Sequence, residues 1–358
     1  MSYINVDQPK FFVNELQYQA SIDNLKTAFW WNGVDHGEGV KTWPIYNHPE
    51  KSWPDVMQGS GGGSNYLDMY LCFCLKEGYW NDILIPEDGS GSNRYGSWFG
   101  MFGHQYAQAN NYWWLRSMVE DIDDAGWAPN NGSSMSYLQN IVNAASAAGS
   151  FMESEVAGWT MAKNLYQDLE ANCKTIAIRL EENIPLSCVA IGNYYSPEHS
   201  PEMGYRMSHT YDGTKFLTTR GGATFSNTYY SGPPVWASGA AWELGYIDSA
   251  GAYQNPSNVR RSGRRIFDFK WKGIGDTSLM PSNSLRTTYI NDSEDSNSVD
   301  FYTQIIKKTL DQSFIFTPDG TNLDPESFMF ARWDNPEIKF NQMTPKLYQF
   351  SKTIVESW

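Results

Sequence analysis

Residues 299–320 read VDFYTQIIKKTLDQSFIFTPDG, and this stretch gives the clearest order of elements in the protein. Apolar side chains recur at helical spacing in its first half, which predicts a helix over residues 298–312 with Ser298 as a candidate N-cap. The aromatic and β-branched run at residues 314–316 then predicts a short strand, and Pro-Asp-Gly at residues 318–320 predicts the turn that ends it. A helix that runs directly into a strand therefore starts the C-terminal unit.

Strand patterns continue from this segment to the C-terminus. Residues 328–333 (FMFARW) predict one strand, and Asp-Asn-Pro at residues 334–336 predicts a turn. Residues 337–341 and 347–357 predict two more strands. The C-terminal unit is therefore expected to be β-rich with one packing helix.

This order resembles the C-terminal half of distal-tail and related minor tail proteins of bacteriophages. The runs that carry the likeness are FMFARWD and IKFNQMTPKLYQFSKTIVESW. In that family the last strand follows the pattern Y-x-x-x-x-x-I-x-E-x-W, which corresponds here to Tyr348, Ile354, Glu356 and Trp358. Upstream, GRRIFDFKW at residues 263–271 is similar to the family's RR-x-x-D-L-x-F strand, and RGGATFSN at residues 220–227 is similar to its glycine turn before a strand.

The resemblance covers about the last 160 residues. It implies a structural protein of a phage tail, with a tail-tube-like β-barrel domain and one packing helix. It also implies a homo-oligomeric ring that contacts other tail proteins as a distal-tail or tail-tip adaptor. On this interpretation the protein is not an enzyme, and it is assembled into the virion tail in the host cytoplasm.

The composition fits a folded β-rich protein. Aromatic residues make up 15% and charged residues 18% of the 358 residues, which argues against disorder. The formal net charge is −14, and no cluster of lysine and arginine offsets it, so binding to nucleic-acid phosphates is not expected. No signal peptide or long apolar run is present in the sequence, and no membrane insertion is expected.

A second β domain is predicted from the segment CKTIAIRLEENIPLSCVAIGNYY at residues 173–195. It predicts strands at residues 175–180 and 186–192 separated by a turn. The pattern resembles the closing strands of discoidin-like, galactose-binding-like β-sandwich modules, which implies a jelly-roll-like sandwich. A further pattern predicts a helix at residues 135–148, inserted in this domain.

The protein is long enough for two or three domains. Residues 1–95 are expected to hold N-terminal strands and long aromatic and glycine-rich loops, including GSGGGS at residues 59–64. Residues 96–195 are expected to form the sandwich. The proline-bracketed run SPEHSP precedes the tail-tube-like domain at residues 196–358. Within that domain, Asp212-Gly213 predicts a hairpin between residues 207–211 and 215–219.

No catalytic, cofactor or metal site is predicted. The sequence HGEG at residues 36–39 lacks a G-x-S-x-G nucleophile elbow, so it carries no acyl-transfer mechanism. The loop DGTNLDPE at residues 319–326 has oxygen ligands but not the EF-hand order, and a turn closed by its own side chains is favoured over calcium. A glycan hydrolase would need two carboxylates, and none of the candidates is distinguished by spacing. These candidates are Asp55, Asp68, Asp121, Asp123, Asp124 and Glu153.

The four cysteines are too few for a disulfide scaffold. Cys72 and Cys74 point to one face of a strand, where core packing is favoured over zinc. Cys173 and Cys188 flank consecutive strand candidates, and the sequence leaves open whether they form a disulfide.

The tryptophan-rich loops allow two interpretations. Exposed Trp side chains stack on sugar rings, and Trp30, Trp31, Trp43 and Trp53 are the candidate glycan contacts. The alternative is that these aromatic side chains fill cores and subunit seams. The first interpretation gives the rival function, a carbohydrate-binding fibre or decoration protein that contacts the host surface.

Overall fold

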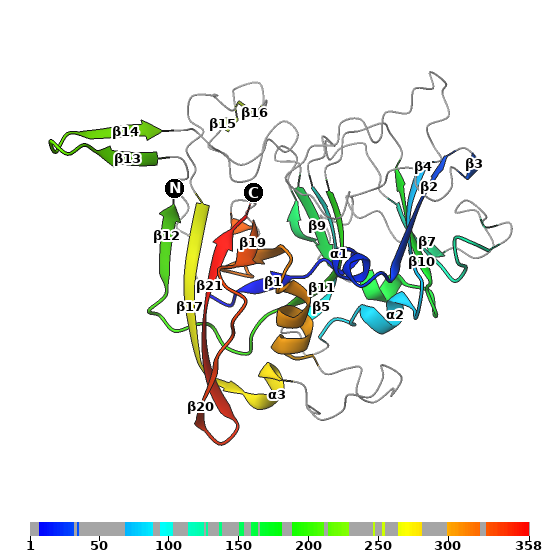
Figure 1. The fold of residues 1–358 in the computed structure, drawn as a ribbon. Coiled ribbons are helices and arrows are strands. Elements are labelled where there is room, and N and C mark those ends of the chain that lie inside the picture. The colour runs from blue at the N-terminus through cyan, green and yellow to red at the C-terminus, as the bar shows by residue number, and fades with distance from the viewer. Residues whose placement is uncertain are drawn as a thin grey trace.

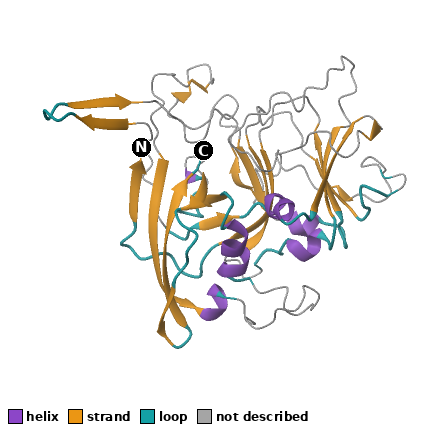
Figure 2. Ribbon diagram, in the orientation of Figure 1, coloured by secondary structure: helices purple, strands orange, loops and turns teal. Residues whose placement is uncertain are grey.

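The computed structural model describes the protein in segments separated by gaps. These are residues 7–31, 34–35, 69–88, 94–102, 114–124, 127, 136–137, 150–153, 159–163, 165–180, 188–210, 214–228, 246–247, 253–254, 264–280, 299–322 and 327–357. The protein is mainly β, as the sequence predicts. Antiparallel strands form an 11-stranded sheet, a six-stranded sheet and two separate strand pairs, and the helices are short (Figures 1 and 2).

The 11-stranded sheet runs through the whole molecule. Its strands lie in the order β12-β17-β21-β19-β18-β1-β11-β5-β9-β8, and β20 pairs with β21 beside β19. Their bounds are β12 Arg206–Thr210, β17 Arg264–Gly275, β21 Leu347–Glu356, β19 Met329–Trp333, β18 Phe314–Thr317, β1 Lys10–Phe12, β11 Cys188–Tyr195, β5 Tyr95–Phe102, β9 Trp159–Lys163, β8 Ser150–Glu153 and β20 Phe340–Thr344.

One half of this sheet packs on the C-terminal helix. The helix consists of a π-helical segment, η4 (Tyr302–Ile306), which continues into α4 (Lys307–Thr309), so it is shorter than the predicted range 298–312. Strand β17 buries alternate residues along RRIFDFKW, which is the pattern of a strand with one face on a core. Phe301, Ile305 and Ile306 of the helix segment meet this face. In the stacked pair beneath the helix, the rings of Trp271 and Phe350 lie 4.6 Å apart.

The other half of the sheet forms a β-sandwich with the six-stranded sheet. That sheet has the order β3-β2-β4-β10-β6-β7. The bounds are β3 Val34–Asp35, β2 Leu25–Trp31, β4 Met69–Leu75, β10 Thr175–Leu180, β6 Trp114–Met118 and β7 Ser136–Tyr137. Phe73 and Ile176 from this sheet pack in one core with Phe99 and Ile191 from the long sheet. Three short helices each contribute a side chain to this core: α1 Glu15–Ser21, α2 Trp80–Ile83 and η3 Leu165–Asp168.

Strand β1 joins the two halves. It pairs with β18 of the C-terminal half on one side and with β11 of the sandwich on the other. Phe11 belongs to the core around the C-terminal helix, whereas Phe12 packs with Trp98 of the sandwich strand β5. Strand pairing therefore crosses both predicted domain boundaries, since the ranges 1–95, 96–195 and 196–358 all contribute strands to the one sheet.

The structure contains the strands predicted at residues 175–180 and 186–192, but it contradicts one predicted hairpin. Strands β10 and β11 lie in different sheets and face each other across the sandwich. Strand β12 pairs with β17, while β13 (Thr214–Thr218) pairs with β14 (Thr224–Thr228), so the strands beside Asp212-Gly213 do not pair with each other. The sequence shows turns clearly, but the partner of a strand depends on distant residues.

The helix predicted at residues 135–148 is also wrong where the structure describes it. Ser136–Tyr137 form β7, which pairs with β6, and the remainder of that range lies outside the described residues. The β-barrel implied by the phage-tail resemblance stays a prediction, because the pairings among the described strands end at β12 and β8 without closing the sheet.

The remaining small elements are α3 (Asp276–Leu279) and the strand pair β15 (Tyr246–Ile247) and β16 (Tyr253–Gln254). Within the described segments, no helix is long and apolar enough to cross a membrane.

Candidate functional site

The predicted glycan-contact residues are only partly placed by the structure. Trp30 and Trp31 are the last two residues of β2, where Trp30 pairs with Tyr70 of β4 and Asp35 of β3. Trp43 and Trp53 lie outside the described residues. Their role in binding carbohydrate therefore stays a prediction.

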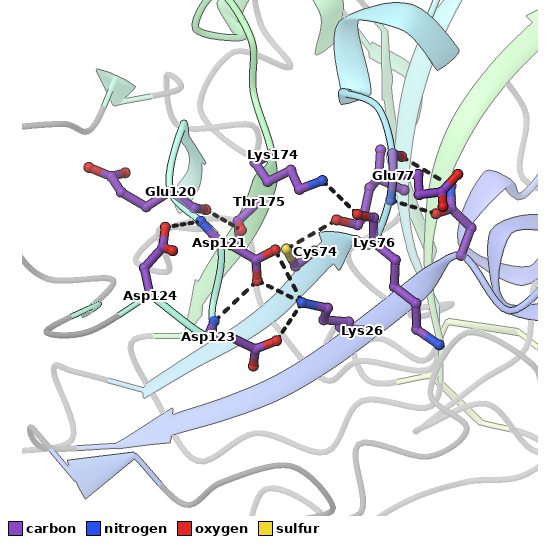
Figure 3. Close-up of polar contacts among 12 residues, drawn as sticks. Lys26, Cys74, Lys76, Glu77, Glu120, Asp121, Asp123, Asp124, Lys174 and Thr175 are labelled. Atoms are coloured by element: carbon purple, nitrogen blue, oxygen red, sulfur yellow. Dashed lines mark hydrogen bonds and ion pairs between the residues drawn. The ribbon is translucent and has the colours of Figure 1, made fainter. Parts of the chain in front are cut away.

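A dense polar cluster lies at one end of the six-stranded sheet (Figure 3). The Lys26 ammonium on β2 donates to both carboxylate oxygens of Asp121, at 3.0 and 3.1 Å, and also to Asp123. The hydrogen bond to Asp123, which outweighs partial burial, raises the pKa of Lys26. Burial works against ionisation of Asp121, but its contact with Lys26 prevails and lowers the pKa of this carboxyl.

The loop that carries these carboxylates closes on itself. The backbone N–H of Asp121 donates to Asp124 Oδ2 at 2.8 Å, and that of Asp123 donates to Asp121 Oδ1 at 3.1 Å. Thr175 Oγ1 donates to the carbonyl oxygen of Glu120 at 2.8 Å and fixes the loop to β10. The carboxylates thus already have one lysine cation and several N–H donors as partners.

The contacts of this polar cluster tie the loop after β6 to β2 and to β10. Lys26 neutralises Asp121 and Asp123 from within the fold, so the candidate hydrolase carboxylates face a protein cation. Among the described residues, no group of three or more His, Cys, Asp or Glu side chains is arranged to hold a metal ion. Lys174 Nζ similarly caps the carbonyl oxygen of Lys76 at 2.9 Å, which ties the β4 end to the β10 start.

The cysteines are packed in cores. All four are free thiols and buried, so Cys173 and Cys188 are not bridged. Cys72 and Cys74 lie on one face of β4, in a small apolar cluster with Tyr70 and Ala177. Burial raises the pKa of Cys173 to about 12, which keeps this thiol protonated and unreactive at neutral pH.

The two sequence motifs behind the phage-tail resemblance meet in one buried ion pair. Arg265 of the RRIFDF strand β17 donates to both carboxylate oxygens of Glu356 on β21, with Nη2–Oε1 at 2.8 Å and Nε–Oε2 at 3.1 Å. Its Nη2 also donates to the carbonyl oxygen of Phe328, beside β19, at 3.0 Å. One guanidinium therefore fixes the ends of three segments.

A polar recess of about 400 Å³ lies on the outer side of this C-terminal half. Lys352 is one of its lining residues, and the Lys352 ammonium donates to Asn335 Oδ1 at 3.1 Å and to the carbonyl oxygen of Glu337 at 2.7 Å. Thr353 Oγ1 donates to Asp268 Oδ1 at 2.6 Å on the same lining. Burial lowers the pKa of Lys352. The recess can offer hydrogen-bond donors and acceptors to a polar ligand.

Exposed apolar side chains gather at the end of the molecule that holds β12. We call this the edge surface and define it by Met203, Met207 and Leu217, which lie just before β12, on β12 and on the hairpin that follows it. Among the described strands, β12 is the last of the long sheet, so its outer edge has no described partner, and the hairpin β13–β14 projects from the body near it (Figure 1). Leu217 on this hairpin is 69% exposed. An unpaired strand edge with exposed apolar residues is a surface suited to another protein.

Comparison with known proteins gives no relative. No protein-family model, no curated protein and no solved structure matches the sequence.

The sequence prediction missed both polar sites. Lys26 is far in sequence from Asp121 and Asp123 and no spacing rule links them, so only the pairing of β2 with β4, β4 with β10 and β10 with β6 brings them together. For the polar recess, the sequence predicted the strand at residues 347–357 but left open which of its faces is buried, so it did not place Thr353 on the outward face.

Proposed function

We propose that this protein is a structural component of a bacteriophage tail, of the distal-tail or tail-tip adaptor type, and that copies of it assemble into a ring. The observation that carries the proposal is the joining of the two resembling motifs, RRIFDF and IVE, by the buried Arg265–Glu356 pair around a sheet that packs on one helix. The two motifs are distant in sequence but share this contact, which supports the interpretation that they belong to one structural unit.

The edge surface supports the assembly part of the proposal. A ring needs a head-to-tail contact in which one surface patch meets a different patch of the next copy. The outer edge of β12, which pairs with no other described strand, and the projecting β13–β14 hairpin offer backbone hydrogen-bonding groups and apolar side chains at one end of the molecule. A two-stranded hairpin by itself is marginally stable in water, so a neighbouring copy would stabilise it.

The test is the oligomeric state of the purified protein, measured by mass photometry and negative-stain electron microscopy. We expect closed rings from the natural sequence and loss of rings in the double variant Met207→Arg and Leu217→Arg. The matched control is Ile22→Arg, which replaces a similarly exposed apolar residue after α1, away from the edge surface. A monomer at every concentration would overturn the ring, and absence of the protein from purified phage particles would overturn the tail assignment.

The polar recess favours a second candidate function, recognition of a host-surface carbohydrate. Its hydroxyl, carboxylate and ammonium groups match the hydrogen-bonding groups of a sugar. Glycan-array binding that is lost in Ser351→Trp, which fills the recess, but retained in the exposed β20 control Asn341→Trp would support this candidate. Binding that instead depends on Trp30, Trp31, Trp43 or Trp53 would move the site to these tryptophans, and no binding to any glycan would contradict this candidate function.

A further inference from the structure

Two buried polar side chains and one partly buried lysine meet where the sandwich contacts the C-terminal helix. Glu15 is the first residue of α1, Asn193 lies on β11 and Lys308 lies on α4. The amide Nδ2 of Asn193 donates to Glu15 Oε1 at 3.3 Å, and the Lys308 ammonium donates to the same oxygen. An amine and a carboxamide, separated by 115 residues in sequence, thus bind a single carboxylate oxygen.

Little of the triad formed by Glu15, Asn193 and Lys308 is exposed to solvent. Glu15 is fully buried, Asn193 is 1% exposed, and the Lys308 side chain is 12% exposed. The Lys308 ammonium also lies 5.9 Å from the centre of the Tyr18 ring. The second oxygen of Glu15, Oε2, is buried and has no hydrogen-bond partner among the residues that the structure describes. Little water therefore reaches the contact between the carboxylate and the carboxamide.

The carboxamide of Asn193 is held rigidly. Its Oδ1 accepts the backbone N–H of Ile85 at 2.9 Å, and its Nδ2 also donates to the carbonyl oxygen of Ile83 at 2.8 Å. The N–H of Ile85 polarises the carboxamide carbonyl and would stabilise negative charge on Oδ1 during attack at Cγ. Acyl transfer requires an electrophilic carbon that is polarised and held beside a nucleophile. Here the Asn193 carboxamide is the electrophile and the Lys308 amine is the nucleophile.

The geometry points to an intramolecular isopeptide bond between Lys308 Nζ and Asn193 Cγ, with Glu15 as the proton relay. Glu15 accepts a proton from the Lys308 ammonium, and the freed amine attacks Cγ. The Nζ–Cγ bond forms, the Cγ–Nδ2 bond breaks, and Glu15 returns protons to the leaving nitrogen. Of the three protons on the Lys308 ammonium, one stays on the new amide and two pass through Glu15 to the leaving nitrogen, which departs as an ammonium ion. Glu15 is a carboxylate before and after the reaction, and no oxidant is needed.

Such a bond would link α4 of the C-terminal half covalently to β11 of the sandwich. It would also enclose the backbone between residues 193 and 308 in one loop, which contains β12, the β13–β14 hairpin and β17. A cross-link at this position would keep the two halves together under mechanical load. This property goes beyond assembly into a ring and does not depend on it.

The first test is the intact mass of the purified full-length protein. We expect a mass lower by one ammonia than the sum of its residues, after allowance for removal of Met1. The variants Glu15→Gln, which cannot relay the proton, and Lys308→Arg, which keeps the charge but not the amine, should both have the full mass. A natural protein with the full mass would overturn the inference, whether or not either variant folds.

Peptide mapping distinguishes this link from other losses of ammonia. A branched peptide that joins Asn193 to Lys308 would support the inference. A linear peptide with a succinimide at Asn193 would overturn it, and so would a link from Lys308 to Gln304, whose Oε1 accepts from the same ammonium at 3.2 Å. The ring test and this test are independent, since one reads the oligomeric state and the other reads the covalent mass.

Discussion

Among single residues, the Arg265–Glu356 pair has the clearest energetic consequence. Both side chains are buried, and breaking a buried pair leaves an uncompensated charge. We expect Glu356→Gln to lower the free energy of unfolding by about 3 kcal/mol in urea titrations. The matched control is Glu337→Gln, which breaks the exposed pair with Lys339 and should cost less than about 0.5 kcal/mol. Equal effects of the two variants would contradict a structural role for the buried pair.

Lys10 gives a pH dependence of stability. Burial, with a smaller contribution from nearby Lys163, lowers the pKa of Lys10 to about 8, below its usual 10.5. Between these values the folded protein holds fewer protons than the unfolded protein, so stability rises as the pH increases. We expect Lys10→Met to raise the free energy of unfolding at neutral pH, by the order of 2 kcal/mol, and to abolish the rise between about pH 8 and about pH 10. Unfolding in urea across this pH range measures both, and an unchanged pH profile would contradict the assignment.

Among the elements, the joint between β1 and β11 depends on one glycine. A Cβ atom on Gly192 would lie 1.9 Å from the carbonyl oxygen of Val13, which is impossible without separating the two segments. The adjacent hydrogen bond from Val13 N–H to the carbonyl oxygen of Asn193 holds them together at 2.9 Å. We expect Gly192→Ala to destabilise the protein by about 3 kcal/mol in thermal or urea unfolding.

Gly204 supplies the control for this change. A Cβ atom there would meet no atom within 4 Å, so Gly204→Ala should alter stability by less than about 0.5 kcal/mol. A similar loss for both variants would mean that glycine flexibility, and not the close approach of β11 to Val13, sets the cost.

Over the molecule as a whole, the two halves should unfold together. The 11-stranded sheet continues from the C-terminal half into the sandwich through β1, and the indole N–H of Trp98 donates to the carbonyl oxygen of Val13 at 3.1 Å across the joint. A continuous hydrogen-bonded sheet with adjoining cores favours one cooperative transition. Calorimetry should therefore give a single peak whose calorimetric and van't Hoff enthalpies agree. Two separated peaks would instead support independent domains on either side of residues 195–196.

The sequence alone was enough to predict the class and many of the local elements. The alternation of Ile176, Ile178 and Leu180 with their neighbours and short aromatic runs such as FIF predicted strands that the structure contains, because burial of one strand face has a period of two residues. The glycine turn at residues 221–222 was predicted as well, and Gly222 has a φ of +83°, a conformation that other residues rarely adopt. Glu356 and Arg265 belong to two motifs of the sequence, which carries no sign that they touch.

Strand partners and the meetings of distant side chains depended instead on the tertiary fold. Strands β10 and β11 follow each other in sequence yet lie in opposite sheets, and β1 pairs with strands far away in the sequence. The local sequence pattern indicates which face of a strand is buried, but it does not indicate which strand pairs with it, because pairing depends on packing between distant segments. The same holds for Glu15, Asn193 and Lys308, whose meeting has no sequence signature because each comes from a different element. Their shared contact arises from the fold, by the docking of α1 and the C-terminal helix on β11.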